Sequence, residues 1–262
     1  MPSHATHRPS EACMFVTLIA MALAGVPDPP PIEPFALRHE RAVGSLCFPS
    51  GLRVTVIEDT RQPVVSVTTI VDRGSASDPL GREGAAHLIE HLWFRASPGG
   101  VPVSHQLDDL GAQHNAFTGR DTTVYITVAD ENALPGILEL EAARLQDVLE
   151  GVDEDVLAEE RALVESELDL NGFVAEDIVR LLPDLRTGET ALLPRNSASI
   201  RSLDRTVLDE VAASYTPANT TIQLTGPLRP RVVREMLAEV FPRELLLDPR
   251  PDAVPGGEDC PV

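Results

Sequence analysis

The chain has 262 residues, 43% of them hydrophobic and 24% charged, a balance that is ordinary for a folded protein and argues against wholesale disorder. Its 21 basic residues are outnumbered by 41 acidic ones, which leaves a formal net charge of −20. So acidic a chain is not expected to bind nucleic acid, whose phosphates need a basic surface. The same charge would either steer cationic substrates toward the protein or simply keep it soluble.

The first two dozen residues predict an export signal. An apolar run from Cys13 to Ala24 follows Arg8 and ends with small residues at alternate positions. This pattern is typical of a signal peptide over residues 1–24, and the run is too short to span a bilayer. We therefore expect an exported protein, periplasmic or secreted, without a stable membrane span. A plain hydrophobic anchor and a misassigned start codon are the alternatives.

The rest of the chain divides by composition. Residues 25–40 begin with a proline-rich stretch and predict an extended linker, and residues 41–242 predict one folded domain. Residues 243–262, rich in Pro and Gly, predict a loose tail. Cys47 and Cys260 would be the cysteines left after cleavage of the signal peptide. Whether they pair stays open, because two cysteines do not define a disulfide framework.

The folded domain combines blocks of strands with blocks of helices. Segments rich in β-branched residues or alternating in polarity predict strands over residues 43–48, 52–58, 64–71, 112–118, 122–128 and 220–225. Amphipathic or capped segments predict helices over residues 83–95, 104–110, 131–150, 153–170, 174–182, 204–214 and 231–240. Because strands and helices do not alternate regularly, we expect an α+β fold with a largely antiparallel sheet flanked by helices.

The chemistry centres on the run His87-Leu88-Ile89-Glu90-His91. Residues four apart share one face of a helix, so His87 and His91 can hold one cation with Glu90 beside them. Neutral imidazole suits zinc, and a catalytic zinc takes three protein ligands and keeps one position open for water. A carboxylate placed like Glu90 can accept the proton of that water, as in the inverted zincin motif. The alternative is that the three side chains merely face solvent on an amphipathic helix.

A third ligand has to come from elsewhere, and the acidic run over residues 158–169 supplies candidates. Glu160 and Glu167 are seven residues apart on one helical face, where an unpaired carboxylate among apolar neighbours would be costly. A solvated acidic face is sufficient to explain Glu159 and Glu165. The residues alone leave open which glutamate would bind a metal.

Three segments make the sequence recognisable. They are GSASDPLGREGAAHLIEHLWFRAS, LDDLGAQHNAFTGRDTTVYITV and EERALVESEL, in this order. Over roughly residues 43–240 the chain resembles the insulinase/pitrilysin family of zinc metallopeptidases, inverted zincins that include the mitochondrial processing peptidases. The resemblance covers the family's N-terminal, zinc-binding half only.

The resemblance implies a role for each matching residue. It implies one Zn²⁺ per chain, held by His87, His91 and Glu167, with Glu160 as a supporting glutamate that lies near the metal without binding it. Glu90 would be the catalytic base. Residues 113–117 would form an edge strand to which an extended peptide substrate adds, and Asn115 and Ala116 match the family's Asn-Ala in that strand.

The expected function is that of a zinc-dependent endopeptidase acting on extended peptides or small unfolded proteins. Family members combine two similar halves, so the resemblance implies a second homologous half-domain as partner; a truncated, weakly active copy is the alternative. The chain could also be a non-catalytic assembly or scaffold subunit, as some relatives are, or a metal-binding module without hydrolysis. Every motif residue that can be placed is present, which favours an enzyme.

Overall fold

The structure is a computed structural model that describes residues 43–171 and 197–247. The signal peptide expected over residues 1–24, the linker over 25–40 and the helix expected over 174–182 lie outside the described residues, as do residues 248–262 with Cys260. Cys47, at the end of the first strand, is disulfide-bonded.

Within the described residues six strands form one open sheet, which confirms the predicted α+β fold. They are β1 (Val43–Cys47), β2 (Arg53–Glu58), β3 (Val64–Val71), β4 (Gln113–Thr118), β5 (Thr123–Asp130) and β6 (Thr220–Gly226), in the spatial order β1-β2-β6-β3-β5-β4. Adjacent strands are antiparallel except β2 and β6, which are parallel. The sheet is therefore largely antiparallel, and β1 and β4 lie at its edges.

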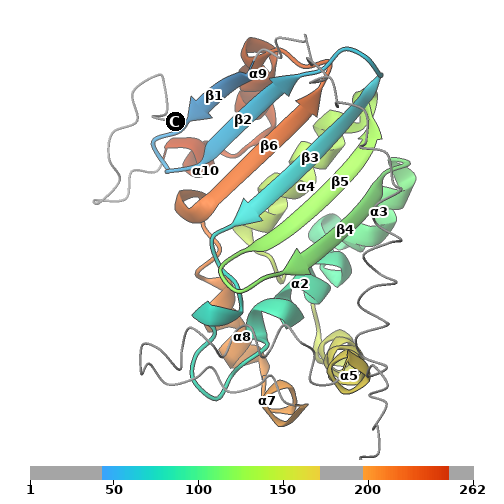
Figure 1. Ribbon diagram of the computed structural model, residues 1–262, viewed down its shortest axis with the longest axis vertical. Coiled ribbons are helices and arrows are strands. Elements are labelled where there is room, and N and C mark those ends of the chain that lie inside the picture. The colour runs from blue at the N-terminus through green and yellow to red at the C-terminus, as the bar shows by residue number, and fades with distance from the viewer. Residues whose placement is uncertain (1–42, 172–196, 248–262) are drawn as a thin grey trace, which may run out of the picture. The chain divides into compact units, whose positions relative to one another are not determined.

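The two faces of the sheet differ in what covers them. Along β3 the side chains of Val65, Val67 and Val71 are buried, whereas Ser66 and Thr68 on the opposite face are partly exposed. This alternation is what a strand with one covered face requires. The described helices lie behind the sheet in Figure 1 or beyond its lower end, and none crosses the face turned toward the viewer. The hydrophobic core thus lies between the sheet and the helices.

The helices account for most of the remaining described chain. The α-helices are α2 (Ala85–Arg95), α3 (Val103–Asp109), α4 (Leu134–Gln146), α5 (Glu154–Asn171), α7 (Ser197–Arg201), α8 (Arg205–Ala212), α9 (Pro230–Val240) and α10 (Arg243–Leu247). Short 3-10 turns are η1 (Ser75–Ser77), η2 (Pro98–Gly100), η3 (Glu131–Ala133) and η4 (Pro217–Asn219).

Two segments differ clearly from prediction. The helix expected to reach residue 150 ends at Gln146, because Asp147 adopts an extended backbone and its carboxylate accepts a hydrogen bond from the Leu149 N–H at 2.9 Å. Residues 243–247, predicted as part of a loose tail, form α10 instead. Leu245 and Leu246 are buried in the core, so this segment belongs to the folded domain.

Helix α4 buries an ion pair against the covered face of the sheet. The Arg144 guanidinium pairs with the Glu141 carboxylate one turn earlier, and both side chains are buried. Glu141 also accepts a hydrogen bond from the Thr69 hydroxyl of β3 at 2.8 Å. The guanidinium carbon lies 4.1 Å from the ring centroid of Tyr125 and 5.4 Å from that of Trp93. Burial lowers the pKa of Arg144 to about 10, so the group is still charged at neutral pH.

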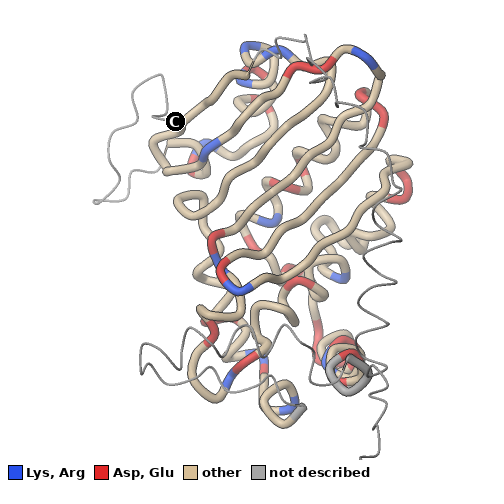
Figure 2. Tube along the Cα trace, viewed as in Figure 1, with Lys and Arg blue, Asp and Glu red and all other residues tan. Residues whose placement is uncertain are grey.

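Charged residues are distributed unevenly along the fold. Figure 2 shows that few of them lie in the middle of the strands, and that acidic residues occur on α5 and in the turns at the strand ends. None of the helices within residues 43–171 and 197–247 combines the length and the hydrophobicity that a membrane span requires.

Candidate active site

Helix α2 is fixed at its start and along one face, and this fixes the direction of its histidines. The Asp78 carboxylate accepts hydrogen bonds from the N–H groups of Gly84 at 2.7 Å and Ala86 at 2.9 Å. Gly84 has φ 98°, and a Cβ there would meet the Ile200 side chain at 2.2 Å, so the turn requires glycine. The apolar face of α2 packs into the core through fully buried residues such as Leu88. The polar face is thereby turned toward α5 and β4.

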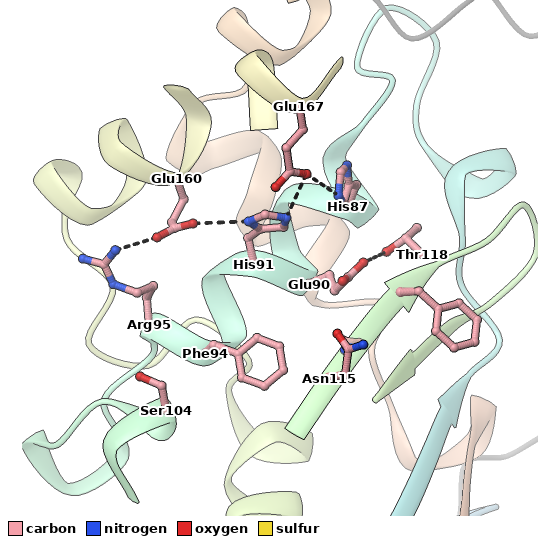
Figure 3. A pocket seen from close by; sticks show the side chains of 12 residues that line it. His87, Glu90, His91, Phe94, Arg95, Ser104, Asn115, Thr118, Glu160 and Glu167 are labelled. Carbon is pink, nitrogen blue, oxygen red and sulfur yellow. Dashed lines mark hydrogen bonds and ion pairs between the residues drawn. The ribbon is translucent and has the colours of Figure 1, made fainter. Parts of the chain in front are cut away.

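Helix α5 packs against α2 and brings a carboxylate to the two imidazoles. The helix starts after Asp153, whose carboxylate accepts a hydrogen bond from the Val156 N–H at 2.9 Å. Glu167 Oε2 lies 3.6 Å from His87 Nε2 and 3.6 Å from His91 Nε2. Figure 3 shows the three side chains converging between the two helices.

These three side chains fit a divalent cation such as zinc. One donor atom from each of His87, His91 and Glu167 lies within 4.8 Å of the others. Bonds of about 2.0–2.1 Å in a tetrahedron place two ligand atoms about 3.4 Å apart. The observed separations of 3.6 Å are close to that value, so little movement would be needed to bind the ion. The structure therefore brings together the three residues expected to bind the metal, although they come from segments about 80 residues apart.

Glu160 takes a different position from Glu167. Its Oε2 lies 3.3 Å from His91 Nδ1, on the side of the ring away from Glu167. Its Oε1 accepts a hydrogen bond from Arg95 Nη1 at 2.5 Å. The Glu160 side chain is buried and lies beside the imidazole pair without joining the group of three donors. This is the place that the resemblance implies for a supporting glutamate.

Glu90 points into the same pocket from the adjacent position of α2. Its side chain is buried, and its Oε2 accepts a hydrogen bond from the Thr118 hydroxyl of β4 at 2.5 Å. Figure 3 shows Glu90 and Thr118 facing each other below the histidines. The hydrogen bond from Thr118 anchors this carboxylate in the pocket beside the two imidazoles.

Strand β4 forms the rim of the pocket and confirms the expected edge strand. Among the described strands it pairs only with β5, so its outer backbone edge is unpaired. Asn115 is exposed and Ala116 half-buried. Both residues line a cavity of about 560 Å³ that also contains His87, Glu90, His91 and Glu167. An extended peptide paired with β4 would therefore pass beside the imidazole pair.

Two residues of the site had not been singled out from the sequence, Arg95 and Thr118. Arg95 follows His91 by four residues, so helical spacing could have pointed to it. Hydrogen bonding to Glu159, together with the contacts to Glu160, raises the pKa of Arg95. Thr118 carries no comparable signal, because its contact with Glu90 depends on how β4 packs against α2.

The fold is that of one half of an insulinase-type peptidase. A protease from Helicobacter pylori has the same fold, with a TM-score of 0.64 and 23% identity over 82% of this chain and 53% of that one. A family model described as Insulinase (Peptidase family M16) matches residues 53–179.

Curated relatives of the chain are consistent with this family model. Mitochondrial-processing peptidase subunit beta of Dictyostelium discoideum is 24% identical over 222 residues, which are 80% of this chain and 46% of that protein. Cytochrome b-c1 complex subunit 1 of Bos taurus is 26% identical over 199 residues, 73% of this chain and 41% of that protein. The chain belongs to the insulinase/pitrilysin family. It spans less than half the length of these curated relatives.

Proposed function

We propose that the chain is the zinc-binding half of a metalloendopeptidase that hydrolyses peptide bonds in extended peptides or small unfolded proteins. The observation that carries the proposal is the convergence of His87, His91 and Glu167 beside the buried Glu90, next to the outer edge of β4, which no described strand pairs with. A zinc ion held by these three side chains would supply Lewis-acid activation of water and of the scissile carbonyl.

Glu90 would act as the general base and then as the general acid. Its carboxylate accepts a proton from the attacking water and passes that proton to the departing amine as the peptide bond breaks. The hydrogen bond from the Thr118 hydroxyl orients this carboxylate within the pocket. Glu160 holds His91 from the far side of its ring, which keeps Nε2 directed at the cation.

Strand β4 would position the substrate. An extended peptide can add to the unpaired edge through main-chain hydrogen bonds, which do not depend on its side chains. Asn115 and Ala116, in the middle of this edge, would then contact the residues around the scissile bond. The net charge of −20 supports a preference for cationic peptides.

A second homologous half-domain is part of the proposal. The chain covers 46% of the mitochondrial-processing peptidase subunit and 53% of the Helicobacter protease, so both relatives contain chain that has no counterpart here. Export through the predicted signal peptide is also proposed, supported by the apolar run over residues 13–24. Size-exclusion chromatography tests the partner: a well-behaved monomer that cleaves peptides alone would contradict it.

The test of the chemistry uses two substitutions. We expect Glu90→Gln to keep stoichiometric zinc and lose peptide hydrolysis, and His91→Ala to lose the zinc. Zinc content of the purified chain and cleavage of a quenched peptide, alone and beside a candidate second half, are the measurements. Unchanged cleavage by Glu90→Gln would refute the assigned mechanism.

A second function is favoured by one relative. Cytochrome b-c1 complex subunit 1 is, by its name, a component of an assembly, which supports a non-catalytic subunit as the alternative. Such a subunit would show no cleavage with any candidate partner, whether or not it binds zinc. Stoichiometric zinc without hydrolysis would instead indicate a metal-binding module.

A further inference from the structure

Helix α2 presents a regular basic stripe to an acidic stripe on α5. His87, His91 and Arg95 follow one another at intervals of four residues, so they lie on one face of the helix. On α5, Glu167 and Glu160 are seven residues apart and face this stripe. Glu167 contacts both histidines, whereas Glu160 contacts His91 and Arg95. The stripe therefore continues one turn beyond the residues proposed to bind metal.

Glu160 is held from two sides. Its Oε2 lies 3.3 Å from His91 Nδ1, and its Oε1 accepts from Arg95 Nη1 at 2.5 Å. Its side chain is only 8% exposed, so its charge needs a partner close by. A neutral imidazole compensates that charge weakly, and among the described residues Arg95 is the cation that Glu160 contacts. The position of Glu160 beside His91 thus depends on Arg95.

Arg95 also contacts Glu159, and this contact can be compared with the one to Glu160. Arg95 Nη2 donates to Glu159 Oε2 at 2.8 Å, but the Glu159 side chain is 66% exposed. Exposed ion pairs contribute little, because water screens both charges. No contact joins Glu159 to either histidine among the described interactions. The two neighbouring glutamates therefore share one arginine, and only one of them touches the site.

We propose that Arg95 is a positioning residue of the metal site: it fixes the Glu160 carboxylate, which in turn holds His91 with Nε2 directed at the cation. The inference rests on the proposed zinc function. Removing a group that orients a metal-ligating histidine weakens metal affinity roughly ten- to hundredfold. Arg95 acts one contact further away, so the expected loss is at the lower end of this range, about tenfold.

The test measures the Zn²⁺ dissociation constant of the purified full-length chain with a competing chelator. We expect Arg95→Met to weaken Zn²⁺ binding about tenfold. Arg95→Lys should stay within about threefold of the wild-type dissociation constant, because an ammonium can still reach Glu160. Glu159→Gln, the control, should leave the affinity unchanged. In a Glu160→Gln background, Arg95→Met should add less than about a twofold change, because its effect passes through Glu160. Thermal unfolding of the zinc-free variants shows whether each one folds, and Arg95→Gln replaces Arg95→Met if the latter does not.

The outcomes separate this inference from the proposed function. Wild-type affinity in Arg95→Met, or an equal loss in Glu159→Gln, overturns the positioning role while leaving the zinc site intact. If Arg95→Met weakens Zn²⁺ binding about tenfold in the Glu160→Gln background as well, the positioning role is also overturned, since Arg95 would then act without Glu160. A wild-type chain that binds no zinc overturns the proposed function and this inference with it.

Discussion

The buried pair of Arg144 and Glu141 supports a quantitative prediction. Replacing Glu141 by Leu removes the carboxylate that pairs with a guanidinium 2% exposed, while the packing of Tyr125 and Trp93 on that guanidinium remains. Leaving one charge of a buried pair without its partner costs about 3–5 kcal/mol of unfolding free energy. For a domain of this size that corresponds to a fall in Tm of roughly 6–20 °C.

The double variant decides whether this reasoning holds. Arg144→Met with Glu141→Leu removes both charges and keeps similar volume, so we expect stability within about 2 kcal/mol of the wild type. Urea unfolding at pH 7, followed by circular dichroism, measures the wild type, both single variants and the double variant. Additive single effects, within about 0.5 kcal/mol, would show that the two groups do not compensate each other and would refute the argument.

Three further predictions concern the approach to α2. Asp78→Ala removes the acceptor of two N–H groups at the start of the helix and should cost about 1–2 kcal/mol in urea unfolding. Gly84→Ala should destabilise more than Gly81→Ala in thermal melts: both glycines have positive φ, but only at Gly84 would a Cβ meet a neighbour, the Ile200 side chain at 2.2 Å. Burial opposes ionisation of Glu83, yet hydrogen bonds from the Gly81 N–H, its own N–H and the Ser199 hydroxyl lower its pKa overall. Ionised Glu83 therefore stabilises the fold at a pH above its ordinary pKa, and this contribution is lost as the pH falls through the lowered pKa. If the difference in unfolding free energy between the wild type and Glu83→Gln stayed the same from pH 7 to pH 3, this prediction would be contradicted.

Local patterns predicted the sheet well because its strands have one covered face. Val64–Val71 alternates so regularly that its predicted and observed bounds coincide. Helix ends were less predictable, since Asp147 stops α4 with a turn that its own side chain makes. Arg144 and Glu141 look like an ordinary exposed pair three residues apart. Their burial follows only from the way α4 packs on the sheet.

The residues of the site that lie on one helix could be predicted from the sequence. His87, Glu90 and His91 lie within two turns, so spacing alone placed them near one another. The role of Glu167 rather than Glu160 needed the resemblance to a family, because both lie on the same face of α5. The hydrogen bond from Thr118 to Glu90 joins β4 to α2, and no local sequence pattern predicts it.

Among the described strands β4 is paired on one side only, and this has a cost for the molecule. If an extended peptide can pair with this edge, as proposed, β4 of a second copy can pair with it as well, since main-chain hydrogen bonds do not distinguish the two. Phe117, 53% exposed on this strand, would add apolar contact to such a pairing. Two chains joined in this way would cover the rim of each other's cavity. The pairing of two copies would then compete with the proposed binding of a peptide at this edge. A high concentration of the protein would favour paired copies, and a high concentration of peptide would favour separate ones.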